Sequence, residues 1–187
     1  MKKWDEIYQQ KLQTPTASLV LTRYSYLLPA HGVTLDLACG QGGNALFLAR
    51  TGLNVFAWDS SQVAIAQLKK QAELEKLAVN AQVRDVITSP PLENSFDVIV
   101  VSFFLDRQLC SQIYNALKPG GIVFYQTYCQ QKTSEQGPTN PDYLLADNEL
   151  LQLFSLLKVR IYQQDALLGD HKKGLRNQAL LVAEKPN

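Results

Sequence analysis

The chain has 187 residues, a length that suits one domain with a single hydrophobic core and is short for two. Its hydrophobic fraction of 46% and charged fraction of 19% exclude a disordered or fibrous protein. The formal net charge of +1 argues against a nucleic-acid binder, which usually carries a basic stripe. Three widely spaced cysteines predict neither a disulfide framework nor a metal cluster. We see no leader and no membrane-spanning apolar run, and therefore expect a cytoplasmic protein without a membrane partner.

The N-terminal part of the chain is predicted to be helical. Residues 4–11 have helical composition and place Trp4 and Tyr8 on one face. The segment Thr14-Pro15-Thr16 is expected to end this helix, and a second helix is expected over about 18–28. Residues 1–30 would then form a helical cap in front of the first strand.

Residues 33–44 combine a strand, a glycine turn and the start of a helix. The apolar run ends at Asp36, and Gly40 and Gly42 follow it before the helical pattern begins at Asn44. Glycines let a ligand approach the main chain, and the free N–H groups of the helix start favour negative charge. A second apolar run, 54–58, delivers Asp59 nineteen residues after Gly40, a spacing that suits a carboxylate bound to ribose hydroxyls.

This stretch resembles the first motif of the class I S-adenosylmethionine-dependent methyltransferases, and the pair Trp58-Asp59 is similar to their ribose-binding motif. A nicotinamide-dependent oxidoreductase is the alternative, because Gly40, Gly42 and Ala45 also satisfy a G-x-G-x-x-A pattern. A carboxylate at a buried strand end is costly unless it has a task, so Asp36 favours the methyltransferase.

The next elements continue an alternation of strands and helices. A capped helix is expected after Ser60-Ser61, followed by a short strand, 81–84, that ends at Asp85. Residues 95–105 form the most continuous apolar run, which is typical of a central strand covered on both faces. A helix over 107–117 leads into the turn L-K-P-G-G and a strand from Ile122. The resemblance includes this turn, which dehydrogenases do not share.

The last third of the chain is predicted to close the sheet. Residues 127–143 form an irregular loop, a helix follows over 147–157, and two strands are expected at 158–162 and 178–183. No helix of useful length fits between these strands, so their pairing should be antiparallel. We therefore predict a single-domain α/β fold of Rossmann-like methyltransferase type, with helices on both faces of a mostly parallel seven-stranded sheet and an antiparallel last strand.

The resemblance implies S-adenosyl-L-methionine as cofactor and S-adenosyl-L-homocysteine as product. Asp36 would hold the amino end of the cofactor, Asp59 the ribose, and Asp85 with the Val86 N–H the adenine. A surface ion pair of Asp85 with Arg84 or Lys76 is the alternative. The expected cofactor-binding residues are Trp4, Tyr8, Asp36, Ala38, Gly40, Gly42, Asn44, Asp59, Ser60, Asp85, Val86 and Ser102.

The acceptor side carries less information. In-line methyl transfer needs mainly alignment, so we expect no dedicated nucleophile. Ser102 would lie closest to the methyl group, and His171 is the candidate general base, although a solvated loop histidine is the plainer interpretation. The other candidates to face the methyl group are Phe103, Phe104, Asp106, Arg107, Tyr125, Thr127 and Tyr128.

Over nearly its whole length the chain looks like the tellurite-resistance and thiopurine branch of small-molecule methyltransferases. This resemblance implies a small-molecule acceptor. From the low net charge and the widely spaced cysteines we expect no nucleic-acid partner and no metal, and we expect a monomer or weak homodimer. A cofactor-binding regulatory protein without catalysis is the third hypothesis.

Overall fold

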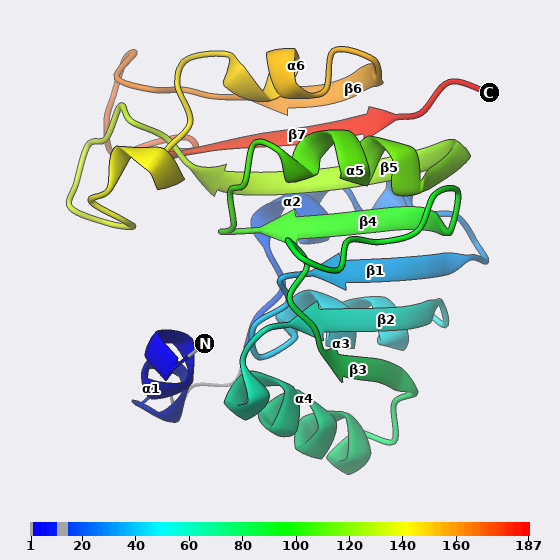
Figure 1. Cartoon of the computed structure of the whole chain (residues 1–187). Helices are drawn as coiled ribbons and strands as arrows, with labels where there is room; N and C mark the ends of the chain where they lie inside the picture. The colour runs from blue at the N-terminus through cyan, green and yellow to red at the C-terminus, as the bar shows by residue number, and fades with distance from the viewer. Residues whose placement is uncertain (1, 11–14) are drawn as a thin grey trace.

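The computed structural model describes residues 2–10 and 15–187. A seven-stranded sheet with the order β3-β2-β1-β4-β5-β7-β6 forms its centre (Figure 1). The strands are β1 (Val33–Leu37), β2 (Asn54–Asp59), β3 (Val79–Val83), β4 (Phe96–Ser102), β5 (Leu117–Tyr128), β6 (Lys158–Gln163) and β7 (Gln178–Glu184). The helices are α1 (Lys2–Gln10), α2 (Leu19–Arg23), η1 (Ser25–Leu27), α3 (Gly43–Arg50), α4 (Gln62–Leu74), α5 (Leu109–Ala116), η2 (Pro141–Tyr143) and α6 (Glu149–Leu153).

Strand pairing follows the predicted pattern. All pairs from β3 through β5 are parallel, and β7 pairs antiparallel with both β5 and β6. The predicted α/β class and the antiparallel last strand are therefore confirmed. The carboxyl ends of β1, β2, β3, β4 and β5 lie at one edge of the sheet, and the start of β7 lies at the same edge.

Helices cover both faces of the sheet. In Figure 1, α5 and α6 lie in front of the strands, and α2 and α3 lie behind them. One core cluster joins β-strand side chains with Ile113 and Phe154, and a second joins the opposite face with Val20 and Leu68. Val98 and Ile99 on β4 belong to different clusters and are both fully buried, which explains why this strand lacks polar alternation.

Two predicted helices are wrong in length. The expected helix 18–28 is α2, which ends at Arg23 and is followed by the short η1. Its Thr22 hydroxyl bonds to carbonyl oxygens of the same turn, an interaction that competes with a regular helix. The expected helix 147–157 is reduced to α6, because Phe154 leaves helical geometry while remaining in the core.

The other predicted elements agree with the structure to within a few residues, except that β5 begins at Leu117 and includes the L-K-P-G-G segment predicted as a turn before Ile122. The first helix is α1, and the predicted positions Lys11 and Thr14 lie outside the described residues. Helix α5 begins at Leu109 rather than at residue 107, and the Asp106 carboxylate accepts a hydrogen bond from the Leu109 N–H just before the regular helix (2.9 Å). Within the described ranges, no helix has the length and apolar character needed to cross a membrane.

Candidate functional site

The turn between β1 and α3 lies close to two side chains. Gly40 and Gly42 have φ values of +54° and +79°, in the left-handed region that favours glycine. A Cβ at Gly42 would lie 2.3 Å from Leu68 Cδ1, and a Cβ at Gly40 would lie 2.7 Å from Tyr8 Oη. The turn is therefore packed between α4 and α1, and larger residues at either glycine would displace one of them.

Asp36 is completely buried at the end of β1. Its Oδ2 accepts a hydrogen bond from the Ala45 N–H (3.0 Å), and its Oδ1 accepts one from Asn44 Nδ2 (3.2 Å). Burial raises the pKa of this carboxyl group to about 7, and the nearby Asp59 adds to the increase. Asp36 thus holds the first turn of α3 in place and is poised to titrate near neutral pH.

Asp59 lies at the end of β2, next to the glycine turn. Its two carboxylate oxygens accept hydrogen bonds from the Gly40 N–H and the Ser61 N–H, both at 2.8 Å. Burial raises the pKa of Asp59 as well, since only 8% of the residue is exposed. In the described part of the chain, no basic side chain lies within 4.0 Å of the carboxylate of Asp36 or Asp59. The two carboxylates beside the glycine turn are therefore buried and have no basic partner among the described residues.

Asp85 and Val86 follow β3 in the neighbouring loop. Asp85 is exposed and its Oδ1 accepts a hydrogen bond from the Ile87 N–H (3.0 Å), whereas Val86 is buried. Arg84 does not pair with Asp85: its guanidinium lies 3.8 Å above the Trp58 ring centroid and donates to the carbonyl oxygens of Ser89 and Pro90. The expected adenine-binding role of Asp85 stays a prediction.

Helix α1 is attached to the start of α4. The Ser61 hydroxyl donates to Asp5 Oδ1 (2.5 Å), and Gln67 Nε2 donates to the Tyr8 carbonyl oxygen (3.2 Å). Trp4 and Tyr8 stack with ring centroids 6.3 Å apart. Burial and the charge of Asp59 raise the pKa of Tyr8. The Tyr8 phenol therefore lies over the glycine turn, beside the two carboxylates.

Asn44 connects three segments. Its Oδ1 accepts hydrogen bonds from the Ser18 N–H (2.8 Å) and hydroxyl (2.9 Å), and its Nδ2 donates to Asp36 and to Ser102 Oγ (2.8 Å). A Cβ on the adjacent Gly43 would lie 2.2 Å from the Thr16 carbonyl oxygen. The segment before α2 is therefore fastened to the glycine turn and to the end of β4.

Residues after β4 and β5 divide into exposed and buried groups. Phe103 is 47% exposed, adopts a φ of 57°, and lies with its ring centroid 5.1 Å from that of Tyr128. This left-handed conformation is strained for an aromatic residue, and such strain is often found at functional sites. Tyr125 and Thr127 are each 1% exposed and line neither of the two cavities, so the structure gives no support to the expectation that they face a ligand. The Tyr125 hydroxyl donates to the Phe104 carbonyl oxygen instead (2.9 Å).

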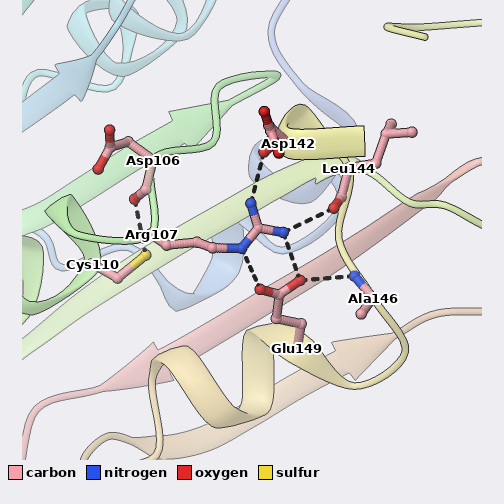
Figure 2. A network of polar contacts seen from close by, with 7 residues as sticks. All are labelled: Asp106, Arg107, Cys110, Asp142, Leu144, Ala146 and Glu149. Atoms are coloured by element: carbon pink, nitrogen blue, oxygen red, sulfur yellow. Dashed lines mark hydrogen bonds and ion pairs between the residues drawn. The ribbon is translucent and has the colours of Figure 1, made fainter. Parts of the chain in front are cut away.

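Arg107 has a structural role that the sequence did not indicate. Figure 2 shows its guanidinium bonded to the Glu149 carboxylate and to the carbonyl oxygens of Asp142 and Leu144. Glu149 also accepts a hydrogen bond from the Ala146 N–H (2.8 Å). These contacts tie the long loop after β5 to α6, which makes Arg107 unavailable as a candidate acceptor-binding residue.

His171 lies on an exposed loop between β6 and β7. Its Nε2 is 2.7 Å from the Leu167 carbonyl oxygen on the same loop. The residue lines neither of the two cavities described at this edge of the protein. The structure therefore gives no support to His171 as a general base.

A cavity of about 440 Å³ lies beside Phe103, where the carboxyl ends of β4 and β5 meet the start of β7. We call it the β7 cavity; its lining includes Ser18, Leu19, Phe103, Gln126, Arg176 and Gln178. Sequence reasoning missed Gln126, Arg176 and Gln178. Gln126 did carry a signal, because a polar residue interrupts the apolar strand there, as Asp36 does in β1. The described residues contain no group of three or more His, Cys, Asp or Glu side chains arranged to hold a metal.

Comparisons with known proteins agree with this fold. The family profile "Tellurite resistance protein TehB" matches residues 1–165. The chain is 36% identical over 87 residues to the probable S-adenosyl-L-methionine-dependent methyltransferase TehB of Haemophilus influenzae, which is 45% of this chain and 30% of that protein. It is 33% identical over 127 residues to Hemagglutinin 1 of Eikenella corrodens, which is 64% of this chain and 41% of the relative. The chain thus spans less than half the length of these curated relatives.

A solved structure extends the match over almost the whole chain. The crystal structure of TehB from Haemophilus influenzae superposes with a TM-score of 0.72 at 25% identity, over 98% of this chain and 67% of the other. Since the family profile covers most of the sequence and the solved fold covers nearly all of it, this chain belongs to the TehB tellurite resistance protein family.

Proposed function

We propose that this chain transfers the methyl group of S-adenosylmethionine to a small-molecule acceptor. One observation carries the proposal: Asp36 and Asp59 are buried on either side of a glycine turn and lack a basic partner in the described part of the chain. Buried charges are normally paired, and the cofactor has a positive sulfonium and a positive ammonium group. The TehB relatives named as probable methyltransferases support the same conclusion.

Each expected residue has a task in this proposal. Gly40 and Gly42 allow the main chain to approach the methionine portion, and Asp36 holds its ammonium group directly or through water. Asp59 accepts hydrogen bonds from the ribose hydroxyls, while Asp85 and the Val86 N–H bind the adenine. When bound, the cofactor supplies an electrophilic methyl group on a positively charged sulfur. Ala38, Asn44 and Ser60 shape the crevice from its two sides, and Trp4 and Tyr8 cover it.

The acceptor is proposed to bring its own reactive electron pair. Among the described residues that line the β7 cavity, none has a side chain that titrates near neutral pH. Ser102 accepts a hydrogen bond from Asn44, whose amide does not act as a base. Thiolates and selenium or tellurium nucleophiles need no proton removed by the protein. The chain would contribute alignment, which can lower such a barrier by roughly 7–11 kcal/mol.

The remaining expectations complete the proposal. The chain would act as one domain, with residues 1–30 as a cap over the cofactor, and as a monomer or weak homodimer in the cytoplasm. Three unpaired cysteines and a net charge of +1 are consistent with a reducing compartment and with the absence of a nucleic-acid partner.

Calorimetric titration with S-adenosylmethionine and S-adenosylhomocysteine tests the cofactor, and fluorescence titration with a reduced nicotinamide dinucleotide tests the competing oxidoreductase. We expect binding of the first two and not of the third. Labelled methyl donor is then offered with thiols, oxyanions, phenols and amines. No cofactor binding would overturn the proposal, and binding without turnover on any acceptor would favour a regulatory protein.

A further inference from the structure

The β7 cavity contains a chain of amide hydrogen bonds with a fixed direction. The Val20 N–H donates to Gln126 Oε1 (2.7 Å), and Gln126 Nε2 donates to Gln178 Oε1 (2.6 Å). A backbone N–H can only donate, so it determines which end of Gln126 is the oxygen, and Gln126 in turn determines the orientation of Gln178. The remaining group, Gln178 Nε2, has no partner among the described residues and belongs to a side chain that lines the cavity.

A second chain of hydrogen bonds has the same direction. The Ser18 N–H donates to Asn44 Oδ1, and Asn44 Nδ2 donates to Ser102 Oγ. Ser102 uses its oxygen as the acceptor in this bond, so its hydroxyl proton remains available. Both chains start at backbone N–H groups just before or within α2, and both end in a hydrogen-bond donor: Ser102 directly before Phe103, and Gln178 in the cavity wall.

The cavity lining of the described chain carries one charged residue, and the Asp165 carboxylate accepts a hydrogen bond from the N–H of the lining residue Leu175 (2.6 Å). The lining residues of the described chain include no Asp or Glu, and Arg176 is the basic residue among them. No described carboxylate lies within 4.0 Å of the Arg176 guanidinium. The guanidinium instead donates to five backbone carbonyl oxygens, those of Asp165, Ala166, Leu168, Asp170 and Lys173. Arg176 therefore holds the loop before β7 and contributes a positive charge that is in no ion pair with a described carboxylate.

We infer that Gln178 is a specificity-determining residue, and that its Nε2 donates to an anionic group on the acceptor, of the kind found in an organic acid. A protonated amine would meet the Gln178 donor and the positive charge of Arg176, whereas a carboxylate gains a hydrogen bond and a favourable charge. A volume of about 440 Å³ is in the range of organic ligand sites and exceeds what a bare inorganic oxyanion fills. This inference rests on the proposed methyl transfer.

Three thiols of similar size and different charge test the inference: 3-mercaptopropionate, 2-mercaptoethanol and cysteamine. Initial rates of S-methyl product formation give kcat and KM for each. Hydrogen bonds to charged groups are worth roughly 1.5–3 kcal/mol, so we expect kcat/KM for the anionic thiol to exceed that for cysteamine by about 10- to 100-fold. The difference should lie mainly in KM.

The variant Gln178→Glu keeps an oxygen for Gln126 but replaces the free donor with a negative charge. We expect it to reverse the order of the two charged thiols. Gln152→Glu, on the exposed surface of α6, makes the same chemical change and should leave the order intact. An unchanged preference in Gln178→Glu, or a preference of the wild type for cysteamine, would overturn the inference.

Binding measurements separate this inference from the proposed function. Titration of S-adenosylhomocysteine-loaded protein with each thiol reports acceptor binding without turnover, and tellurite serves as the inorganic anion. Binding of the thiol acid alone supports the inference even if no thiol is methylated, whereas binding of tellurite alone or of cysteamine contradicts it. Unchanged S-adenosylmethionine affinity in Gln178→Glu would show that the cofactor site is intact. If the wild type does not bind S-adenosylmethionine at all, the proposed function itself is wrong.

Discussion

The cofactor-side half of the molecule, β1–β3 with the glycine turn, and the acceptor-side half, β5–β7 with its loops, are organised differently. Around the turn, Asp36 and Asp59 bond to backbone N–H groups two to nineteen residues away in sequence. On the acceptor side, Gln126 bonds to segments 106 and 52 residues away, and Arg107 reaches across 42 residues to Glu149. The first half is built from a compact motif, whereas the second depends on contacts between distant segments.

The largest effect is expected at Asp59. Asp59→Ala removes the carboxylate that bonds to Gly40 and Ser61 and the proposed ribose contact, so we predict at least a 100-fold weaker S-adenosylmethionine affinity by calorimetry. Asp170→Ala, on the exposed loop before β7, is the matched control and should bind normally. Equal affinities in the two variants would mean that the turn is not the cofactor site.

A substitution at Gly43 tests whether the two halves are joined through the N-terminal segment. Gly43→Ala places a Cβ against the Thr16 carbonyl oxygen and should destabilise the fold by about 1–3 kcal/mol in urea unfolding, because backbone must shift. Gly169→Ala is the control, since nothing lies within 4 Å of its Cβ, and only its φ of +74° opposes the change. A smaller loss of unfolding free energy in Gly43→Ala than in Gly169→Ala would contradict the close packing of Thr16 against Gly43.

The buried carboxylates predict a pH dependence of cofactor binding. A bound cation favours ionised Asp36, whose pKa is about 7 in the free protein. Below pH 7 binding must first remove a proton, so the dissociation constant should rise by up to about tenfold per unit as pH falls from 7 to 5. The neighbouring Tyr8, Cys39 and Asp59 carry no positive charge that would reverse this sign. A flat profile in the wild type would show that Asp36 does not face the cofactor's charge.

The same shift predicts the stability of the free protein. The folded-state pKa of Asp36 lies above its ordinary value of 3.8, so the folded chain binds more protons than the unfolded chain between these values. The stability that this raised pKa contributes to the folded state is therefore present at low pH and is lost as the pH rises towards 7. We therefore expect the free energy of unfolding, measured in urea, to fall less between pH 4 and pH 7 in Asp36→Asn than in the wild type.

The smallest effect is expected at Arg107. Arg107→Lys keeps the charge but cannot reproduce the paired bonds to Glu149 and the two carbonyl contacts. Because the Arg107–Glu149 pair is partly exposed, we expect the free energy of unfolding to fall by only about 1 kcal/mol. Hydrogen exchange in residues 140–149 should become faster, and cofactor affinity should not change. Arg160→Lys, in an exposed pair with Glu184, is the control. Weakened cofactor binding in Arg107→Lys would contradict the separation of the two halves.

Sequence reasoning succeeded where the signal was local. Strand periodicity, together with the lack of room for a helix between the last two strands, predicted the sheet and its reversed strand. The spacing from Gly40 to Asp59 predicted a ribose-binding carboxylate, and in the structure that carboxylate accepts a hydrogen bond from the Gly40 N–H. The link between Ser18 and Asn44 and the orientation of Gln178 had no such signal, because partners far apart in sequence are joined only by the completed fold. The burial of Tyr125 was missed for a related reason, since strand alternation does not say which face a later helix covers.

Arg107 and Arg176 hold their loops largely by backbone carbonyl oxygens. Every amino acid has that group, so residues within these loops can be exchanged without releasing either arginine. Libraries that vary the exposed side chains of Asp142, Leu168 and Lys173 should therefore keep folded members at high frequency. The surface of both loops can thus be changed while the arginines keep their bonds and the cofactor half is left as it is.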